Sequence, residues 1–241
     1  IMSIVHLNDE QLTWESEKQL DLRTKAGRMA PFVEMKLLND EGDTVPNDGK
    51  SVGEIVARGP WMTQGYYKDL ENSEKLWRDG WLHTGDKAHI SDSGHIYIVG
   101  RIKDILVLNN GEKVPPADIE AAIVSNGLVD QALVVGEGQS YLAALLVING
   151  ESWPQIAQQL GLDPLQNDSL GSKVLQQHFV RLLRQWLFEF PAYARIRRVH
   201  LTLQPWTIEN DLLTPTLKVK RALVEQRYDK EIKALYQDTS S

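Results

Sequence analysis

Cysteine is absent from the 241 residues of this sequence. Its absence excludes a disulfide scaffold, a zinc site built on thiolates and a cysteine nucleophile, and it favours a reducing compartment. No apolar run approaches the roughly 18 residues of a membrane-spanning helix, and the first residues lack the basic-then-apolar pattern of a signal peptide. We therefore expect a cytoplasmic protein.

Basic residues are also fewer than acidic residues. The chain carries 26 Lys and Arg against 33 Asp and Glu, which gives a net charge of −7 at pH 7. A chain with this balance has no overall attraction for nucleic acid or anionic lipid. We expect no nucleic-acid partner, and any anionic ligand must be bound by a local group of cations.

Glycine is missing from the last 70 residues of the chain, since all 17 glycines lie at or before Gly171. The first two-thirds is divided by turns into short segments with the alternating apolar pattern of strands. The elements expected in the first part are strands over residues 33–37, 53–58, 87–90 and 95–99 and a short helix over residues 73–78.

The pattern changes after residue 100. Residues 105–108 form an apolar run that ends at the turn signal of residues 109–111. The elements expected beyond it are helices over residues 115–125, 173–190 and 223–235 and strands over residues 133–135 and 141–148. We expect a mixed fold, in which a β-rich, barrel-like unit over residues 1–102 precedes a small α+β domain over residues 103–241.

The first polar segment of interest, residues 81–86, reads Trp-Leu-His-Thr-Gly-Asp. We expect a tight turn at Gly85 with the carboxylate of Asp86 at its mouth. Such a carboxylate can accept two hydrogen bonds from the hydroxyls of a ribose, as acidic residues do in other nucleotide sites. A structural turn in which Asp86 bonds its own backbone explains the same pattern, and the motif by itself favours this structural interpretation.

The second polar segment, residues 100–104, reads Gly-Arg-Ile-Lys-Asp and lies where the pattern changes. Arg101 could clamp a phosphate or a ribose, and a flexible link beside it could let two domains rotate. The alternative is a solvated linker.

The third segment, residues 213–221, places three cations in four positions just before the last expected helix. Cations at a helix N-terminus oppose its dipole, so a structural account explains them poorly. An ammonium that binds phosphate as a point charge and a solvated, capped helix start are equal alternatives here.

Signals for a metal site are weak. His83, His89 and His95 recur every six residues, but the turn expected over residues 91–94 keeps them from sharing one strand face. We expect no metal site in this chain.

In this order and spacing, the three segments resemble the C-terminal part of the adenylate-forming, AMP-binding enzymes, and among these the long-chain acyl-CoA synthetases. Residues 81–86 are similar to the family's Thr-Gly-Asp motif, residues 100–104 to its hinge motif and residues 110–120 to the stretch after the hinge. Residues 212–221 have the form that is typical of fatty-acid synthetases. The resemblance covers nearly the whole chain and implies a truncated adenylate-forming fold.

The resemblance implies an ATP-dependent reaction in two halves. In the first, the carboxylate of a long-chain fatty acid attacks the α-phosphate of ATP, which gives acyl-AMP and pyrophosphate. By position in the motifs, Lys218 is the catalytic cation, while Asp86 and Arg101 bind ATP or AMP.

In the second half, the thiol of coenzyme A displaces AMP. The resemblance implies that Lys103 is the hinge about which the C-terminal domain rotates. This rotation would remove Lys218 after adenylation and bring Asn110 and Gly111 to the path of coenzyme A, where a residue without Cβ permits close approach.

Two motifs of the family are not found here: a Ser/Thr/Gly-rich phosphate loop, and a Tyr-Gly-x-Thr-Glu-like segment whose glutamate helps to hold magnesium. We therefore expect a fragment whose Mg²⁺ ligand lies upstream and which forms no acyl-AMP alone. Two alternatives stay open, a fatty acyl-AMP ligase that loads a carrier protein and a non-catalytic binding module with the same fold.

Peripheral membrane association is a further alternative, because long acyl chains partition into bilayers. The one candidate segment is residues 175–190, with Arg181 and Arg184, and core packing explains this segment better.

Overall fold

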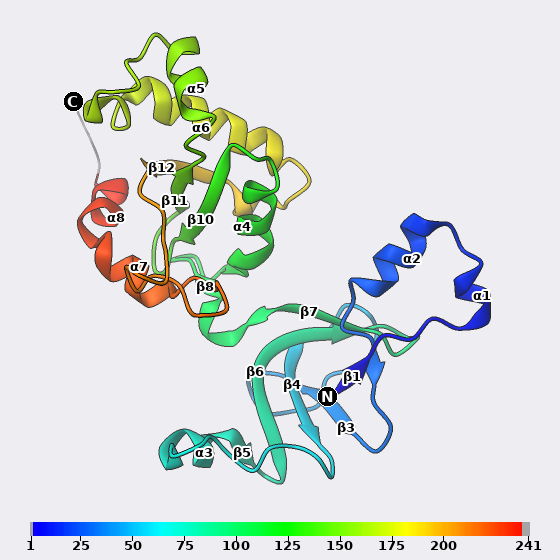
Figure 1. The fold of residues 1–241 in the computed structure, drawn as a ribbon. Helices are drawn as coiled ribbons and strands as arrows, with labels where there is room; N and C mark the ends of the chain where they lie inside the picture. Colours follow the sequence, from blue (N-terminus) through cyan, green and yellow to red (C-terminus); the bar gives the residue numbers. More distant parts are fainter. Residues whose placement is uncertain (1, 238–241) are drawn as a thin grey trace. The chain divides into compact units, whose positions relative to one another are not determined.

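The computed structural model describes residues 2–237 and divides into two compact units, Ile1–Asp104 and Ile105–Ser241 (Figure 1). The first is rich in strands, and the second combines a three-stranded sheet with helices. The mixed fold expected from the sequence is confirmed. No helix among residues 2–237 is both long enough and apolar enough to cross a membrane.

The first unit is built on one antiparallel sheet. Its strands are β3 (Glu34–Leu38), β4 (Gly53–Arg58), β5 (Trp77–Arg78), β6 (Trp81–Ile90) and β7 (Ile96–Arg101). β4 lies between β3 and β6, while the far side of β6 pairs with β5 at its start and with β7 at its end. The predicted strands and hairpin are confirmed, and β6 bends strongly along its length in Figure 1.

The short helix α3 (Leu70–Leu76) begins three residues before its predicted start. The side chain of Asp69 accepts the backbone N–H of Asn72 and so caps the first turn. The helix ends where Trp77 becomes extended and pairs with Leu82 of β6. The predicted helix is therefore present but lies earlier in the chain than expected.

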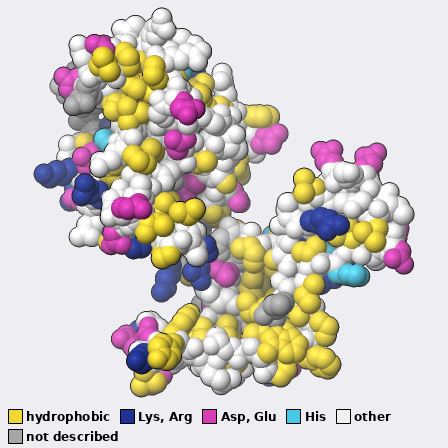
Figure 2. Space-filling model, in the orientation of Figure 1, with side chains coloured by type: hydrophobic (Ala, Val, Ile, Leu, Met, Phe, Trp, Pro, Cys, Tyr) yellow, Lys and Arg dark blue, Asp and Glu magenta, His cyan; other side chains and the backbone are white. Residues whose placement is uncertain are grey.

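The N-terminal part of this unit holds four short elements that the sequence pattern did not predict. They are β1 (Ser3–Ile4), α1 (Asp9–Leu12), α2 (Ser16–Arg23) and β2 (Arg28–Met29), and β1 pairs with β2. The unit buries its apolar residues in two small clusters. Many hydrophobic side chains remain at its surface (Figure 2), among them Phe32, which is 83% exposed, and Tyr67, which is 89% exposed.

The second unit is built on a sheet in the order β10 (Val129–Val135), β11 (Leu142–Ile148) and β12 (Ile196–Thr202). β10 is antiparallel to β11, and β12 is parallel to it. All seven residues of β11 are buried, because alternate side chains enter two hydrophobic clusters on opposite faces of the sheet.

Helices cover both faces. The cluster on one face includes residues of α4 (Pro116–Val124), α5 (Trp153–Gln159) and α6 (Lys173–Trp186), and the cluster on the other includes residues of α7 (Arg221–Arg227) and α8 (Asp229–Tyr236). The short strands β8 (Leu106–Val107) and β9 (Lys113–Val114) pair beside the predicted turn.

Two helices of this unit differ from their predicted extents. α6 ends at Trp186 rather than at residue 190, because a turn closed by the N–H of Phe190 and the C=O of Leu187 follows it. The single C-terminal helix is in fact two, which break at Tyr228 so that residues of both enter one cluster. Three residues of α6 are buried in the core, as the packing interpretation of residues 175–190 requires.

Arg221 ties the start of α7 to the sheet. Its guanidinium donates to the backbone C=O of Val134 at 2.7 Å and to Glu120 Oε1 at 2.5 Å, and the same Glu120 oxygen accepts the N–H of Val134 at 2.7 Å. The side chains of Arg221 and Glu120 are only 18% and 20% exposed. The expectation that a structural account explains this cation poorly is wrong, because its carboxylate partner lies about a hundred residues away in the sequence.

Replacing Arg221 by alanine is expected to lower the free energy of unfolding of the second unit by about 2–3 kcal/mol. The carboxylate of Glu120 and the C=O of Val134 would each lose a hydrogen-bond donor in a partly buried site. Urea unfolding monitored by tryptophan fluorescence would measure the change. The matched control is Arg227→Ala, an exposed arginine at the other end of α7, which should change stability by less than about 0.5 kcal/mol. Equal losses of stability in the two variants would show that the contacts of Arg221 with Glu120 and Val134 do not stabilise the unit.

Candidate functional site

Residues 81–86 do not form a turn, and that prediction is wrong. They belong to the ten-residue strand β6, which carries a bulge. β4 advances two residues from Glu54 to Val56 while β6 advances four from His83 to Lys87. Gly85 has a φ of +72°, a value that residues with a Cβ rarely adopt. The glycine is therefore explained by the bulge.

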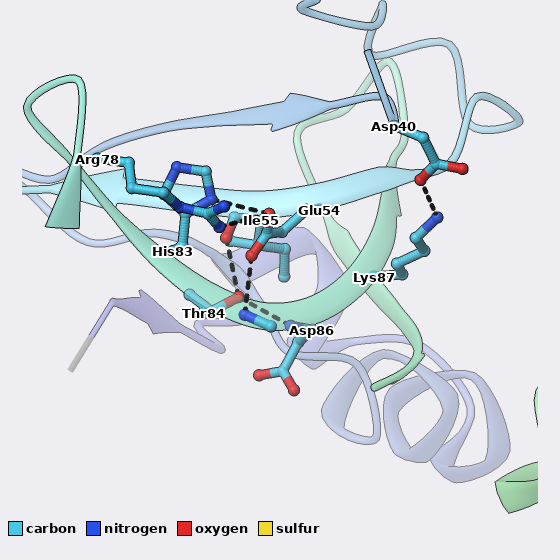
Figure 3. A network of polar contacts seen from close by, with 9 residues as sticks. Asp40, Glu54, Ile55, Arg78, His83, Thr84, Asp86 and Lys87 are labelled. Atoms are coloured by element: carbon cyan, nitrogen blue, oxygen red, sulfur yellow. Dashed lines mark hydrogen bonds and ion pairs between the residues drawn. The ribbon is translucent and has the colours of Figure 1, made fainter. Parts of the chain in front are cut away.

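Three hydrogen bonds hold the bulge in place (Figure 3). Thr84 Oγ1 donates to the C=O of Ile55 at 2.8 Å and accepts the N–H of Asp86 at 3.1 Å. The N–H of Gly85 donates to Glu54 Oε1 at 3.1 Å. Figure 3 shows that the carboxylate of Asp86 points away from Glu54. The bulge therefore binds the carboxylate of Glu54 and directs that of Asp86 outward.

Asp86 and Arg101 are brought together by strand register, because they are direct partners on β6 and β7. Arg101 Nε donates to Asp86 Oδ1 at 2.9 Å, and Arg101 Nη2 donates to the C=O of Thr84 at 3.4 Å. The side chain of Asp86 is 33% exposed and that of Arg101 is 64% exposed. Asp86 bonds Arg101 rather than its own backbone, so the structural turn is also excluded and a carboxylate–guanidinium pair faces solvent.

Glu54 is a site residue that the sequence pattern did not single out. Its side chain is 14% exposed and its second oxygen lies 2.8 Å from His83 Nδ1 and 3.8 Å from Arg78 Nη2. Residues from all these segments line one open depression of about 700 Å³, including Glu54, Thr84, Arg101 and Lys103. The available signal was a glutamate next to Gly53 in a strand that is otherwise largely buried.

Lys103, the predicted hinge, lies in a 3₁₀ helix of one turn, Ile102–Asp104, that follows β7. These are the last residues of the first compact unit. Lys103 lines the same depression as Arg101, so these two candidates of the first unit are neighbours.

Lys218 is presented by a closed loop of the second unit. The N–H of Thr214 donates to the C=O of Lys218 at 2.8 Å, and the N–H of Lys218 donates to Thr214 Oγ1 at 3.0 Å. Leu217, within the loop, has a φ of 60°. Lys218 is exposed, and its ammonium has no hydrogen bond or ion pair with any residue that the structure describes. The other cations differ, since Lys220 pairs with Asp211 and Arg221 with Glu120.

Asn110 and Gly111 form the turn between β8 and β9. Asn110 Oδ1 accepts the N–H of Glu112 at 3.0 Å, and the N–H of Gly111 donates to the C=O of Leu108. A Cβ added to Gly111 would meet nothing within 4 Å. Within this unit, the backbone φ of +83° at Gly111 therefore explains why glycine occupies this position. Asn110 also lines a cavity of about 930 Å³ together with Arg184, Arg195 and other residues of this unit.

Histidine and carboxylate side chains are scattered over the described residues. Between residues 2 and 237 no three His, Asp or Glu side chains are grouped so that they could hold a metal ion. The three histidines at six-residue spacing have separate surroundings: His83 lies against Glu54, His89 stacks on Tyr97 and His95 lies 2.9 Å from the hydroxyl of Ser93.

Comparison with family models gives two matches along the chain. Residues 103–240 match the model of the AMP-binding enzyme C-terminal domain, and residues 4–67 match that of the AMP-binding enzyme. The chain belongs to the AMP-binding enzymes. Residues 103–240 correspond to the C-terminal domain of this family.

Curated relatives of this AMP-binding enzyme include ligases with different acceptors. A chloroplastic long-chain-fatty-acid–[acyl-carrier-protein] ligase of Arabidopsis thaliana is 33% identical over 88% of this chain and 29% of its own length. The long-chain-fatty-acid–CoA ligase 6 of Homo sapiens is 34% identical over 78% of this chain and 27% of its own length. The chain thus spans less than a third of the length of these two relatives.

A solved structure shows the same fold. The A domain of the carboxylic acid reductase from Segniliparus rugosus, in complex with AMP and a co-purified carboxylic acid, matches with a TM-score of 0.72 and 26% identity. The match covers 88% of this chain and 34% of that one. The expected adenylate-forming fold is confirmed.

Proposed function

We propose that this chain supplies the nucleotide, hinge and acceptor residues of an ATP-dependent ligase that joins a long-chain fatty acid to coenzyme A through an acyl-AMP intermediate. Membership of the AMP-binding enzymes and the acyl-activating relatives support the reaction class. The observation that carries the proposal is the outward Asp86, held by a bulge that glycine makes possible and paired with Arg101.

In the first half-reaction, a fatty-acid oxygen attacks the α-phosphorus of ATP and pyrophosphate leaves. Asp86 accepts hydrogen bonds from the ribose hydroxyls, for which Oδ2 serves while Oδ1 binds Arg101. Lys218 supplies a preorganised cation for the charge that spreads over the carboxylate and phosphate oxygens. Its ammonium suits this role because no ion pair with a described residue has to be broken first.

In the second half-reaction, a thiol attacks the acyl carbon and AMP leaves. The turn of Asn110 and Gly111 lines the path of the thiol, and Lys103 is the hinge that exchanges it with Lys218. The cavity beside Asn110 is lined by Arg184, Arg195 and Arg197, and guanidinium groups suit a phosphate-bearing acceptor.

The test of the nucleotide role uses the complete ligase, meaning this chain joined to the further portion that its relatives carry. Asp86→Asn should raise the KM for ATP about tenfold or more in fatty-acid-dependent pyrophosphate exchange, because charged hydrogen bonds to the ribose are lost. Asp92→Asn, in the exposed turn after β6, is the matched control. An unchanged KM for Asp86→Asn would refute the role, and pyrophosphate release by the 241 residues alone would refute their dependence on the further portion.

A carrier protein is the second candidate acceptor, favoured by the identity to the acyl-carrier-protein ligase. Assays of the complete ligase with coenzyme A and with a phosphopantetheine-bearing carrier protein would separate the two. We expect the faster acyl transfer with coenzyme A. Gly111→Trp should block that transfer, since a large side chain would enter the thiol path, and leave acyl-AMP formation intact.

A further inference from the structure

The sheet of the second unit has two edges, and only one of them is closed by side chains. At β10, both backbone groups of Val134 bond to side chains, the N–H to Glu120 and the C=O to Arg221. At β12, one side pairs with β11, and on the other side no described residue forms a hydrogen bond with the backbone of residues 197–201. Among the described residues, the edge of β12 therefore has no partner and can bond another strand.

β12 lies at the floor of a groove of about 780 Å³, between α6 on one side and α8 on the other. The residues that line it come from all three elements: Arg197, Arg198 and His200 from β12, Lys173, Arg181 and Arg184 from α6, and Glu231 and Leu235 from α8. We call this the β12 groove. Seven residues of strand are about 23 Å long at 3.3 Å per residue, so a short extended segment fits along it.

The β12 groove is strongly cationic, although the chain as a whole is acidic. Residues 173–200 contain six Lys and Arg against one Glu, while the chain carries a net charge of −7. None of the Lys and Arg side chains in the groove forms an ion pair with a described residue. Arg181 instead contacts His178, and Arg198 donates to the C=O of Gln237. Burial lowers the pKa of His200 and Glu231 opposes this, so Lys and Arg account for the positive charge at neutral pH.

We propose that the β12 groove binds an acidic, extended segment of a partner protein, which joins the sheet as a fourth strand beside β12. Backbone hydrogen bonds to the free edge would supply affinity, and the arginines would select acidic side chains. Cations on an edge strand also hinder chance pairing between copies of a protein. Here, however, Lys173, Arg181 and Arg184 come from α6 rather than from the edge itself, so they serve an incoming anionic chain. The proposal does not depend on the ligase activity.

The test uses the 241-residue chain and a blocked seven-residue peptide of alternating Glu and Val. Binding is measured by fluorescence anisotropy of labelled peptide, and hydrogen exchange follows the amides of β12. We expect binding that weakens with salt, as charge pairing requires, together with slower exchange of alternate β12 amides. A peptide with Lys in place of Glu should not bind, nor should an acidic peptide whose outward-bonding amides are N-methylated.

Charge reversal of the wall of the groove gives a second readout. Lys173→Glu combined with Arg181→Glu should weaken binding roughly tenfold or more; neither residue lines the cavity beside Asn110. The matched control, Lys18→Glu with Arg23→Glu, makes the same charge change on exposed positions of α2 and should leave binding close to unchanged.

Three results would overturn the proposal. Equal binding of the N-methylated peptide would mean that charge alone is recognised, without strand addition. Binding of vesicles that contain anionic lipid, with no binding of the peptide, would assign the face to a membrane. No binding of the acidic peptide at low salt would show that the cations only protect the edge.

Discussion

Replacing Lys218 by alanine in the complete ligase is expected to slow acyl-AMP formation by about 10²–10³-fold, the loss that removal of one preorganised group at a reacting oxygen typically causes. The structure gives this lysine the properties of such a group. Two hydrogen bonds with Thr214 fix its backbone, and its ammonium has no competing ion pair among the described residues. Because Lys218 is exposed, the substitution should leave the stability of the second unit within about 0.5 kcal/mol.

The two half-reactions make this prediction specific. Pyrophosphate exchange measures adenylation, whereas synthetic acyl-AMP mixed with coenzyme A measures thioester formation alone. Lys218→Ala should impair the first and leave the second close to unchanged, because the proposed hinge motion would remove Lys218 before the thiol attacks. Lys230→Ala, at an exposed position of α8, controls for the loss of a surface charge. Undiminished adenylation by Lys218→Ala would show that Lys218 takes no part in the first half-reaction.

The local sequence pattern was sufficient to predict those elements whose residues fit only one kind of secondary structure. The strand Gly53–Arg58 is predicted to the residue, because its apolar positions and its flanking turns agree. The buried strand Leu142–Ile148 is also predicted closely, since a continuous apolar run of this length fits a strand covered on both faces. Register within such strands then brings Asp86 and Arg101 together, which their separate motifs do not show.

The bulge at Gly85 could not be predicted in the same way. A glycine followed by Asp86 is typical of a turn, and what makes it a bulge is the pair of acceptors on the neighbouring strand, Glu54 and the C=O of Ile55. Those residues lie about thirty positions earlier in the chain. Sequence pattern therefore identified the candidate carboxylate but not the conformation that presents it.

The three cations of residues 218–221 show the same limit. In sequence they form one basic cluster, yet Asp211 pairs with Lys220 and Glu120 with Arg221, which leaves Lys218 as the cation without a described partner. The partner of Arg221 precedes it by about a hundred residues, so no local pattern distinguishes a structural cation from an available one. The role of Lys218 in the reaction stays a prediction that the kinetics above would test.

Lys103→Pro is the second substitution with a large expected effect, and it should separate the two half-reactions. Proline fixes φ near −65° and restricts the residue before it, so a hinge in the turn Ile102–Asp104 would be held in one of its two conformations. One half-reaction should continue, while the other should fall by about 10²-fold, since a misplaced catalytic group costs at least that much. Pyrophosphate exchange and thioester formation from synthetic acyl-AMP measure the two rates.

The control for this prediction is Lys103→Ala, which removes the ammonium but keeps the backbone free. If the hinge acts through the backbone, Lys103→Ala should retain both half-reactions at similar rates, and only proline should separate them. A fall in adenylation with both substitutions would instead indicate that the ammonium itself is needed in the depression that it shares with Arg101. Equal loss of both half-reactions in Lys103→Pro would place the hinge elsewhere, because a block to rotation must spare the reaction whose orientation it preserves.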